Sequence, residues 1–150
     1  MDPGLEDMLR GAENLLFIGI GNVLKSDDGV GVEISNHLLD RGKIRSLTVE
    51  VSIENYIGKI NSMAPERIVL VDCMDIGSSP GSYRLMSLEN VEDQTFNTHN
   101  ISLGRFGEFI PFPTYILGIQ PQTLEFGDRL SPTVQHTADK LIQLINQITE

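Results

Sequence analysis

The sequence predicts an α/β fold, a three-layer sandwich in which a mostly parallel, twisted sheet carries helices on both faces. Short apolar runs at residues 15–20, 67–73 and 114–119 are typical of strands buried on both faces. Segments with helical spacing of apolar residues separate these runs, so strands and helices alternate along the chain. Right-handed crossovers then allow the third strand to lie beside the first, which gives the order 2-1-3 at the centre of the sheet.

The first half of the chain supplies three of the expected strands. The run at 15–20 ends in a turn with Gly and Asn, and an imperfect apolar stripe from Asp28 predicts a helix that Gly42 closes. The elements expected after it are an alternating strand at 46–52, a short helix at 54–62, the buried strand at 67–73 and a turn-rich loop at 75–82.

The second half of the chain begins with a possible strand at 83–88 and an irregular polar stretch at 89–98. A helix is expected from about residue 100 or 102 to 109, then a strand at 114–119 and a last helix at 132–148. Ser131 can cap that last helix, and Pro132 suits its first position. Residues 1–150 are expected to form one domain, in which residues 1–13 are an N-terminal extension.

Composition limits the classes of function. The 150 residues carry a formal charge of −10, which repels nucleic acid and anionic membranes. One cysteine excludes a disulfide framework within one chain, and no apolar run approaches the roughly 20 residues that span a bilayer. The polar N-terminal segment does not resemble a signal peptide. We therefore expect a cytoplasmic protein, and a monomer, because a domain of this size can close its own core.

The stretch "GIGNVLKS" (19–26) almost matches two phosphate-binding motifs, the P-loop and the dinucleotide fingerprint. Leu24 stands where both patterns require glycine, and the paired acids Asp27 and Asp28 would repel a phosphate. Nucleotide binding is therefore disfavoured. The turn is instead predicted to hold Asp28 in a cleft as a ligand or a base. The alternative is structural: Asp27 caps the helix and Asp28 is a solvated acid in its first turn.

Three polar residues are expected to meet at the carboxyl edge of the sheet, where strands one and three open a cleft. Asp28 follows the first strand, Asp72 ends the third, and His99 lies at a loop-to-helix junction. Together they would form a nitrogen and oxygen site for a divalent ion such as nickel, zinc or manganese. Structural alternatives remain for each residue: Asp72 could bind loop amides, and His99 could lack a ligand role.

The other chemically reactive residues have simpler interpretations. Asp75 is expected to fix its own turn, and His37 and His136 to be surface or packing residues. Cys73 is expected to pack as a small residue, because no base that could activate it is evident.

Four motifs occur in one order over residues 15–147: "FIGIGNVLKSDDGVGVEI", "IVLVDCMDIGSSPGSYRL", "THNISLGRF" and "YILGIQPQTLEFGDRLSPTV". Together they resemble the hydrogenase maturation endopeptidase family. The "GIQP" segment and the aspartate at position 28 resemble the branch that serves formate-hydrogenlyase and energy-converting hydrogenases. The sequence departs from the family at Cys73, where alanine is more frequent.

The resemblance implies a nickel-dependent endopeptidase that removes the C-terminal extension of a [NiFe]-hydrogenase large-subunit precursor after nickel insertion. It implies that Asp28, Asp72 and His99 are both the metal-sensing and the catalytic residues. The nickel would come with the precursor, and cysteine sulfurs of the precursor would complete its coordination. The alternative is a metallochaperone or assembly factor that binds the nickel-loaded precursor without cutting it. Shortening of the precursor would distinguish the two.

Overall fold

A five-stranded sheet forms the centre of the computed structural model, which describes residues 4–90 and 103–148. The strand order is β2-β1-β3-β5-β4, and only β4 runs antiparallel to its neighbour. The strands are Leu15–Ile20 (β1), Ile44–Glu50 (β2), Arg67–Cys73 (β3), Tyr83–Ser87 (β4) and Thr114–Ile119 (β5). The predicted fold class and the central order 2-1-3 are confirmed.

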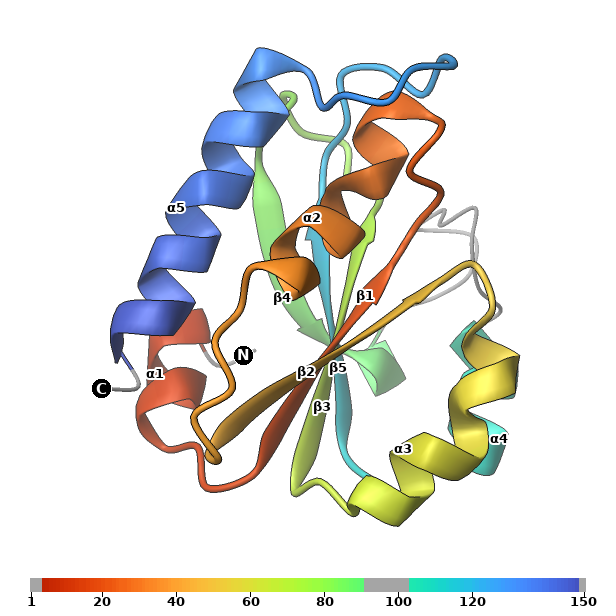
Figure 1. Cartoon of the computed structure of the whole chain (residues 1–150), viewed down its shortest axis with the longest axis vertical. Helices are drawn as coiled ribbons and strands as arrows, with labels where there is room; N and C mark the ends of the chain where they lie inside the picture. The colour runs from red at the N-terminus through yellow and green to blue at the C-terminus, as the bar shows by residue number, and fades with distance from the viewer. Residues whose placement is uncertain (1–3, 91–102, 149–150) are drawn as a thin grey trace.

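Helices cover both faces of the sheet (Figure 1). One face carries α1 (Leu5–Arg10), α2 (Val30–Asn36) and α5 (Pro132–Ile148), and the other carries α3 (Ile57–Met63) and α4 (Leu103–Phe109). Three 3₁₀ turns complete the list of helical elements in the described residues: Ser26–Gly29 (η1), Ile53–Tyr56 (η2) and Leu88–Asn90 (η3).

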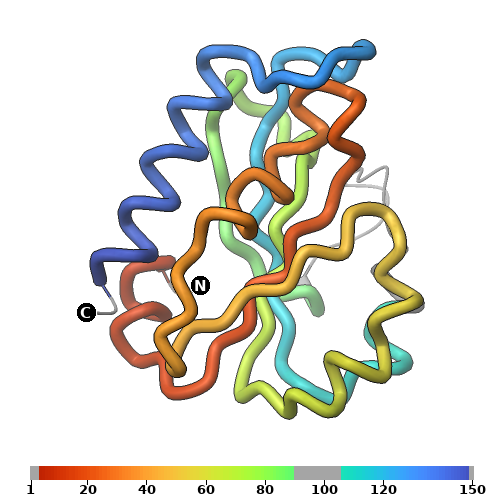
Figure 2. Tube along the Cα trace, in the orientation of Figure 1, coloured from red at the N-terminus to blue at the C-terminus, as the bar shows by residue number. Residues whose placement is uncertain are grey.

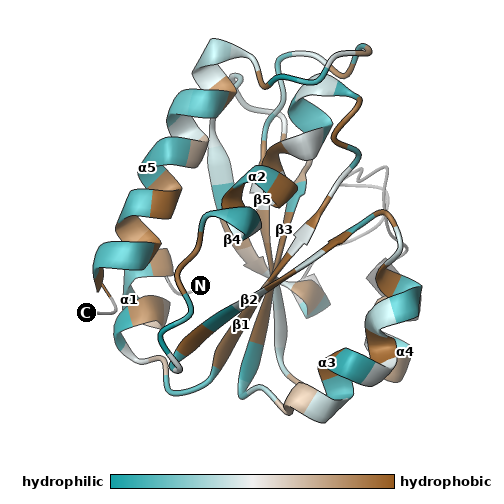
Figure 3. Cartoon of the chain, in the orientation of Figure 1, coloured by the Kyte–Doolittle hydropathy of each residue, from teal (hydrophilic) through white to brown (hydrophobic). Residues whose placement is uncertain are grey.

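The sheet separates two apolar cores. Consecutive strand residues point to opposite faces, so Phe17 packs in the core under α2 and α5, while Ile18 packs in the core under α3 and α4. Figure 3 shows the apolar strands inside and the polar helix faces outside. Burial on both faces explains why β1, β3 and β5 are continuous apolar runs, and their predicted bounds agree with the structure.

The predicted helix from Asp28 to Gly42 is wrong at its end, because α2 stops at Asn36. Asn146 of α5 binds the backbone that follows α2. Its Oδ1 accepts the Leu39 N–H at 2.9 Å, and its Nδ2 donates to the His37 carbonyl at 3.0 Å. These bonds satisfy backbone groups just beyond the helix end.

Strand β2 begins and ends two residues earlier than predicted. Its last residue, Glu50, has a left-handed φ of 53°, and its carbonyl accepts the Gly21 N–H at 3.0 Å. The chain therefore turns away before residues 51 and 52 can extend the strand.

The expected N-terminal extension contains a helix, α1, that belongs to the core. Leu5, Met8, Leu9 and Ala12 are buried, and α1 contacts α5. Their spacing of three, four and seven residues is that of one helical face. Within the described residues, no helix is long and apolar enough to cross a membrane.

Candidate active site

The turn after β1 is built to hold Asp28. Gly21 has a φ of 148°, and a Cβ added to it would lie 2.0 Å from the Asp28 carbonyl oxygen. The chain therefore folds back on itself at a distance that only glycine permits. The Asn22 N–H donates to Asp28 Oδ2 at 3.1 Å, and Asp28 is 3% exposed. The alternative of a solvated first-turn acid is therefore wrong for Asp28.

The start of α2 lies directly on the carboxyl ends of β1 and β3. A Cβ on Gly31 would lie 2.0 Å from the Val71 carbonyl oxygen and 2.5 Å from that of Ile20. Asp72, the next residue of β3, is fully buried, and its Oδ1 accepts the Cys73 N–H at 2.8 Å. The 3₁₀ turn η1 also contacts β3, so the fold brings Asp28 and Asp72 to the same edge of the sheet.

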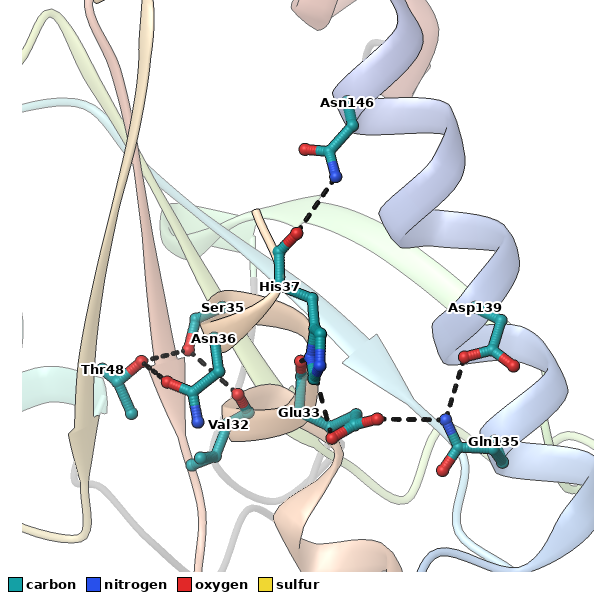
Figure 4. A network of polar contacts seen from close by, with 9 residues as sticks. All are labelled: Val32, Glu33, Ser35, Asn36, His37, Thr48, Gln135, Asp139 and Asn146. Atoms are coloured by element: carbon teal, nitrogen blue, oxygen red, sulfur yellow. Dashed lines mark hydrogen bonds and ion pairs between the residues drawn. The ribbon is translucent and has the colours of Figure 1, made fainter. Parts of the chain in front are cut away.

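A network of polar contacts fixes α2 between β2 and α5 (Figure 4). The hydroxyls of Ser35 and Thr48 lie 2.6 Å apart, and Thr48 also donates to Asn36 Oδ1 at 2.8 Å. On the other side, Gln135 Nε2 of α5 donates to Glu33 Oε2 at 3.1 Å. Because α2 follows η1 without a break, these contacts also restrict the position of Asp28.

Asp27 joins the turn to a distant loop. Its buried carboxylate accepts the N–H groups of Gln122, Thr123 and Ser131 and the Ser131 hydroxyl, at 2.7–3.1 Å. Figure 2 shows the loop that follows β5 passing over the start of α2. Neither η1 nor α2 has a side-chain cap, so the alternative of Asp27 as a helix cap is wrong. Its partners lie 95 to 104 residues away, which explains why local sequence patterns miss this role.

The pKa of Cys73 reflects its burial next to the carboxyl edge of the sheet. Burial raises the pKa of its thiol far above the ordinary value, and the negative charges of Asp72, Asp28, Asp27 and Asp75 raise it further. The thiol is buried and protonated at neutral pH, so it lacks the character of a nucleophile. This agrees with the prediction of a packed small residue.

The remaining predicted residues are placed as follows. Asp75 Oδ1 accepts the Gly77 N–H at 3.1 Å and fixes its turn, as predicted. His37 and His136 lie at the surface, and His37 Nδ1 is 3.8 Å from the Glu33 carboxylate of the same helix. His99 lies outside the described residues. Among the residues that are described, no three histidine, cysteine, aspartate or glutamate side chains form a metal-binding group.

A solvent-open groove of about 450 Å³ lies beside the carboxylate edge, between α2 and the start of α5. Val23, Val32, Glu33, Leu130 and Gln135 are among the residues that line it, whereas Asp28 and Asp72 are not. The groove therefore lies beside the turn that carries Asp28, and neither carboxylate is part of its lining.

Comparison with known proteins identifies the family. The profile of the hydrogenase maturation protease family HycI matches residues 48–148, about two thirds of the chain. The chain belongs to the hydrogenase maturation protease family. It is accordingly an endopeptidase that acts in hydrogenase maturation, and the sequence resemblance is confirmed.

Individual relatives agree with this assignment. The chain is 25% identical to the hydrogenase 3 maturation protease of Escherichia coli over 139 residues, which cover 85% of this chain and 86% of the relative. A Methanocaldococcus jannaschii protein whose name also places it among hydrogenase maturation proteases is 26% identical over 167 residues, covering 100% of this chain and 96% of the relative. The maturation protease HycI of Thermococcus kodakarensis has the same fold, with a TM-score of 0.83, 25% identity and 97% coverage of both chains.

Proposed function

We propose that this endopeptidase removes the C-terminal extension of a [NiFe]-hydrogenase large-subunit precursor after nickel has been inserted, acting as a cytoplasmic monomer. The observation that carries the proposal is the pair of buried carboxylates, Asp28 and Asp72, at the carboxyl edges of β1 and β3. Two acids are costly to bury unless polar groups or a cation compensate their charge. Backbone N–H groups supply part of that compensation at both residues.

In this proposal Asp28, Asp72 and His99 bind nickel that belongs to the substrate. Carboxylate oxygen and imidazole nitrogen are suitable ligands for nickel, and cysteine sulfurs of the precursor would add further ones. Such an ion can polarise a carbonyl or lower the pKa of a bound water. Asp28 or Asp72 then serves as general base. In another form of the proposal, nickel only aligns the peptide, and positioning supplies most of the rate.

Cys73 takes no part in the proposed chemistry. Its raised pKa and its burial oppose formation of a thiolate, and thiolate is the nucleophilic form. The peptide bond is therefore expected to be cut by water rather than through an acyl-enzyme on cysteine.

The deciding experiment uses one large-subunit precursor prepared with and without nickel. Each preparation is mixed with wild-type protein, with Asp28→Asn, or with Glu66→Gln as a control at an exposed acid that precedes β3. Mass spectrometry then reads the length of the precursor. We expect a C-terminal peptide to be lost only with nickel, and only with wild type and the Glu66→Gln control.

Two other results would contradict the proposal. Cutting without nickel would remove the nickel requirement while leaving the endopeptidase. Stable binding without cutting would favour an assembly factor, provided that a second maturation protease shortens the same preparation.

The same assay tests the three site residues. Asp28→Asn, Asp72→Asn and His99→Ala should each abolish processing while circular dichroism shows an intact fold. Wild-type processing rates in all three variants would exclude this site.

A further inference from the structure

The edge of the sheet that carries the two carboxylates also presents exposed apolar side chains. Phe126 is 90% exposed, more than any other large apolar residue in the described part of the chain. Leu24 and Val23 are 59% and 39% exposed. We call these three residues the apolar rim. A side chain as exposed as Phe126 contributes little to the core, so folding alone does not explain it.

Hydrogen bonds pair the two segments that carry the apolar rim. The Gly127 N–H donates to the Leu24 carbonyl at 3.0 Å, and the Ser26 N–H donates to the Gly127 carbonyl at 2.9 Å. The Ser26 hydroxyl also donates to the Glu125 carbonyl at 2.5 Å. Leu24 and Phe126 therefore lie on two neighbouring segments that are hydrogen-bonded to each other, rather than on two independent loops.

The apolar rim is also tied to the carboxylates. Asp27 accepts hydrogen bonds from Thr123 and Ser131, on either side of Phe126, and is itself the neighbour of Asp28. Leu24 lies four residues before Asp28, within the turn in which the Asn22 N–H donates to the Asp28 carboxylate. Hydrogen bonds of Asp27 and Asp28 thus connect the turn that holds Asp28 to the segment that carries Phe126.

We propose that the apolar rim is the docking surface for the hydrogenase large-subunit precursor, and that it packs against an apolar patch next to the cleavage site. The inference rests on the proposed function, which supplies the occupant. A protein whose peptide reaches Asp28 and Asp72 must cover this edge of the sheet. Exposed apolar patches of this kind mark protein interaction sites, and aromatic anchors carry much of the binding energy.

The charge of the chain supports an apolar mode of contact. At −10 the protein repels acidic partners over long distances. Contact through Phe126 and Leu24 adds affinity that does not depend on the sign of the charges on the precursor.

The test compares Phe126→Ser, Leu24→Ser and the double variant with Leu39→Ser. Leu39 is a matched control, because it is 50% exposed but lies beyond the far end of α2. Processing of the nickel-loaded precursor gives kcat and KM, and calorimetry with the precursor gives Kd in an Asp28→Asn background. We expect KM and Kd to rise at least tenfold in the double variant, with the change falling on KM rather than kcat. Leu39→Ser should stay within twofold of wild type.

The outcomes separate this inference from the proposed function. If wild type does not cut the precursor, the proposed function fails, whereas normal cutting with unchanged KM and Kd in the double variant overturns the docking surface alone. Sedimentation tests a second occupant: a wild-type dimer that Leu24→Ser dissociates would assign the apolar rim to self-association and would also overturn the proposal. Urea unfolding of each variant checks that the fold is retained.

Discussion

Asp27 and Asp28 are consecutive, but their carboxylates bind different parts of the chain. Asp28 accepts a backbone N–H from its own turn, whereas Asp27 accepts three N–H groups and a hydroxyl from the loop before α5 and from its N-terminus. We therefore assign Asp27 to positioning: it holds residues 122–131 against the turn that carries Asp28.

Replacing Asp27 should cost considerable stability. In Asp27→Asn the charge is lost, and an NH₂ group meets donors that previously shared two carboxylate oxygens. Hydrogen bonds to a charged group contribute about 1.5–3 kcal/mol each, so we expect a loss of about 2–4 kcal/mol in the free energy of unfolding. Urea unfolding at pH 7 measures it. Glu66→Gln, at an exposed acid, should change the same quantity by less than about 0.5 kcal/mol. Equal effects at the two positions would contradict the assignment.

Cys73 should make stability depend on alkaline pH. An unfolded thiol ionises near pH ~8.5, whereas burial and nearby carboxylates raise the pKa of the folded thiol well above that value. From about pH 8.5 upward the unfolded state therefore releases a proton that the folded state keeps, and stability falls as pH rises.

Between pH 8 and pH 10 this effect should remove about 1–2 kcal/mol from the free energy of unfolding of wild type relative to Cys73→Ala. Lysines and tyrosines titrate in both proteins, so the difference between the two urea unfolding curves isolates the thiol. Parallel pH dependence of wild type and Cys73→Ala would show that the folded thiol ionises normally.

The helices and strands whose apolar residues form a clear local pattern could be predicted from the sequence. Strands β1, β3 and β5 and helix α5 have the bounds that their apolar runs predict, because burial on two faces or on one helical stripe leaves a clear pattern. Helix α1 was missed, since six residues give a weak signal and its stability comes from packing on α5.

The candidate site also has a part that the sequence predicts and a part that it does not. The placement of Asp28 and Asp72 at one edge follows from parallel topology, which the sequence predicts. The partners of Asp27 depend on contacts about 100 residues apart in sequence, and no local pattern contains them. The role of His99 stays a prediction.

The contact between α2 and the strand ends can be tested at two glycines. Gly31→Ala would place a Cβ within 2.0 Å of the Val71 carbonyl oxygen, and backbone on both sides cannot move without shifting the helix. We expect a loss of about 2–4 kcal/mol in the free energy of unfolding, with reduced processing because η1 moves together with α2.

Gly58→Ala is the matched control. Gly58 also lies within a helix, α3, but nothing stands within 4 Å of its added Cβ. The alanine should stabilise the protein by about 0.5–1 kcal/mol, because it reduces the freedom of the unfolded chain. Chemical denaturation of both variants measures the contrast. Similar changes at Gly31 and Gly58 would mean that α2 can move off the sheet at little cost.

At the scale of the whole molecule, acidic residues outnumber basic ones by 21 to 11, and the paired acids Asp27 and Asp28 lie at the proposed site. Pairing of individual side chains cannot change the sum, which remains −10 at pH 7. Four aspartates act on the single thiol of Cys73 at the carboxyl edge of the sheet. The protein therefore holds its proposed binding site together against mutual repulsion, and a cation at that edge would relieve part of it.

This repulsion predicts that salt stabilises the fold. Raising NaCl from about 0.01 to 0.15 M shortens the screening length from roughly 30 to 8 Å, which weakens repulsion between distant carboxylates more than contacts within one hydrogen-bonded turn. We expect the free energy of unfolding at pH 7 to rise by about 1 kcal/mol, or the melting temperature by roughly 4 °C. The control is the same titration near pH 4.6, the isoelectric point of the sequence, where the net charge vanishes and the salt effect should vanish with it. An equal gain at both pH values would assign the effect to general salting-out, and a loss of stability at pH 7 would show that attractive ion pairs outweigh the excess of acids.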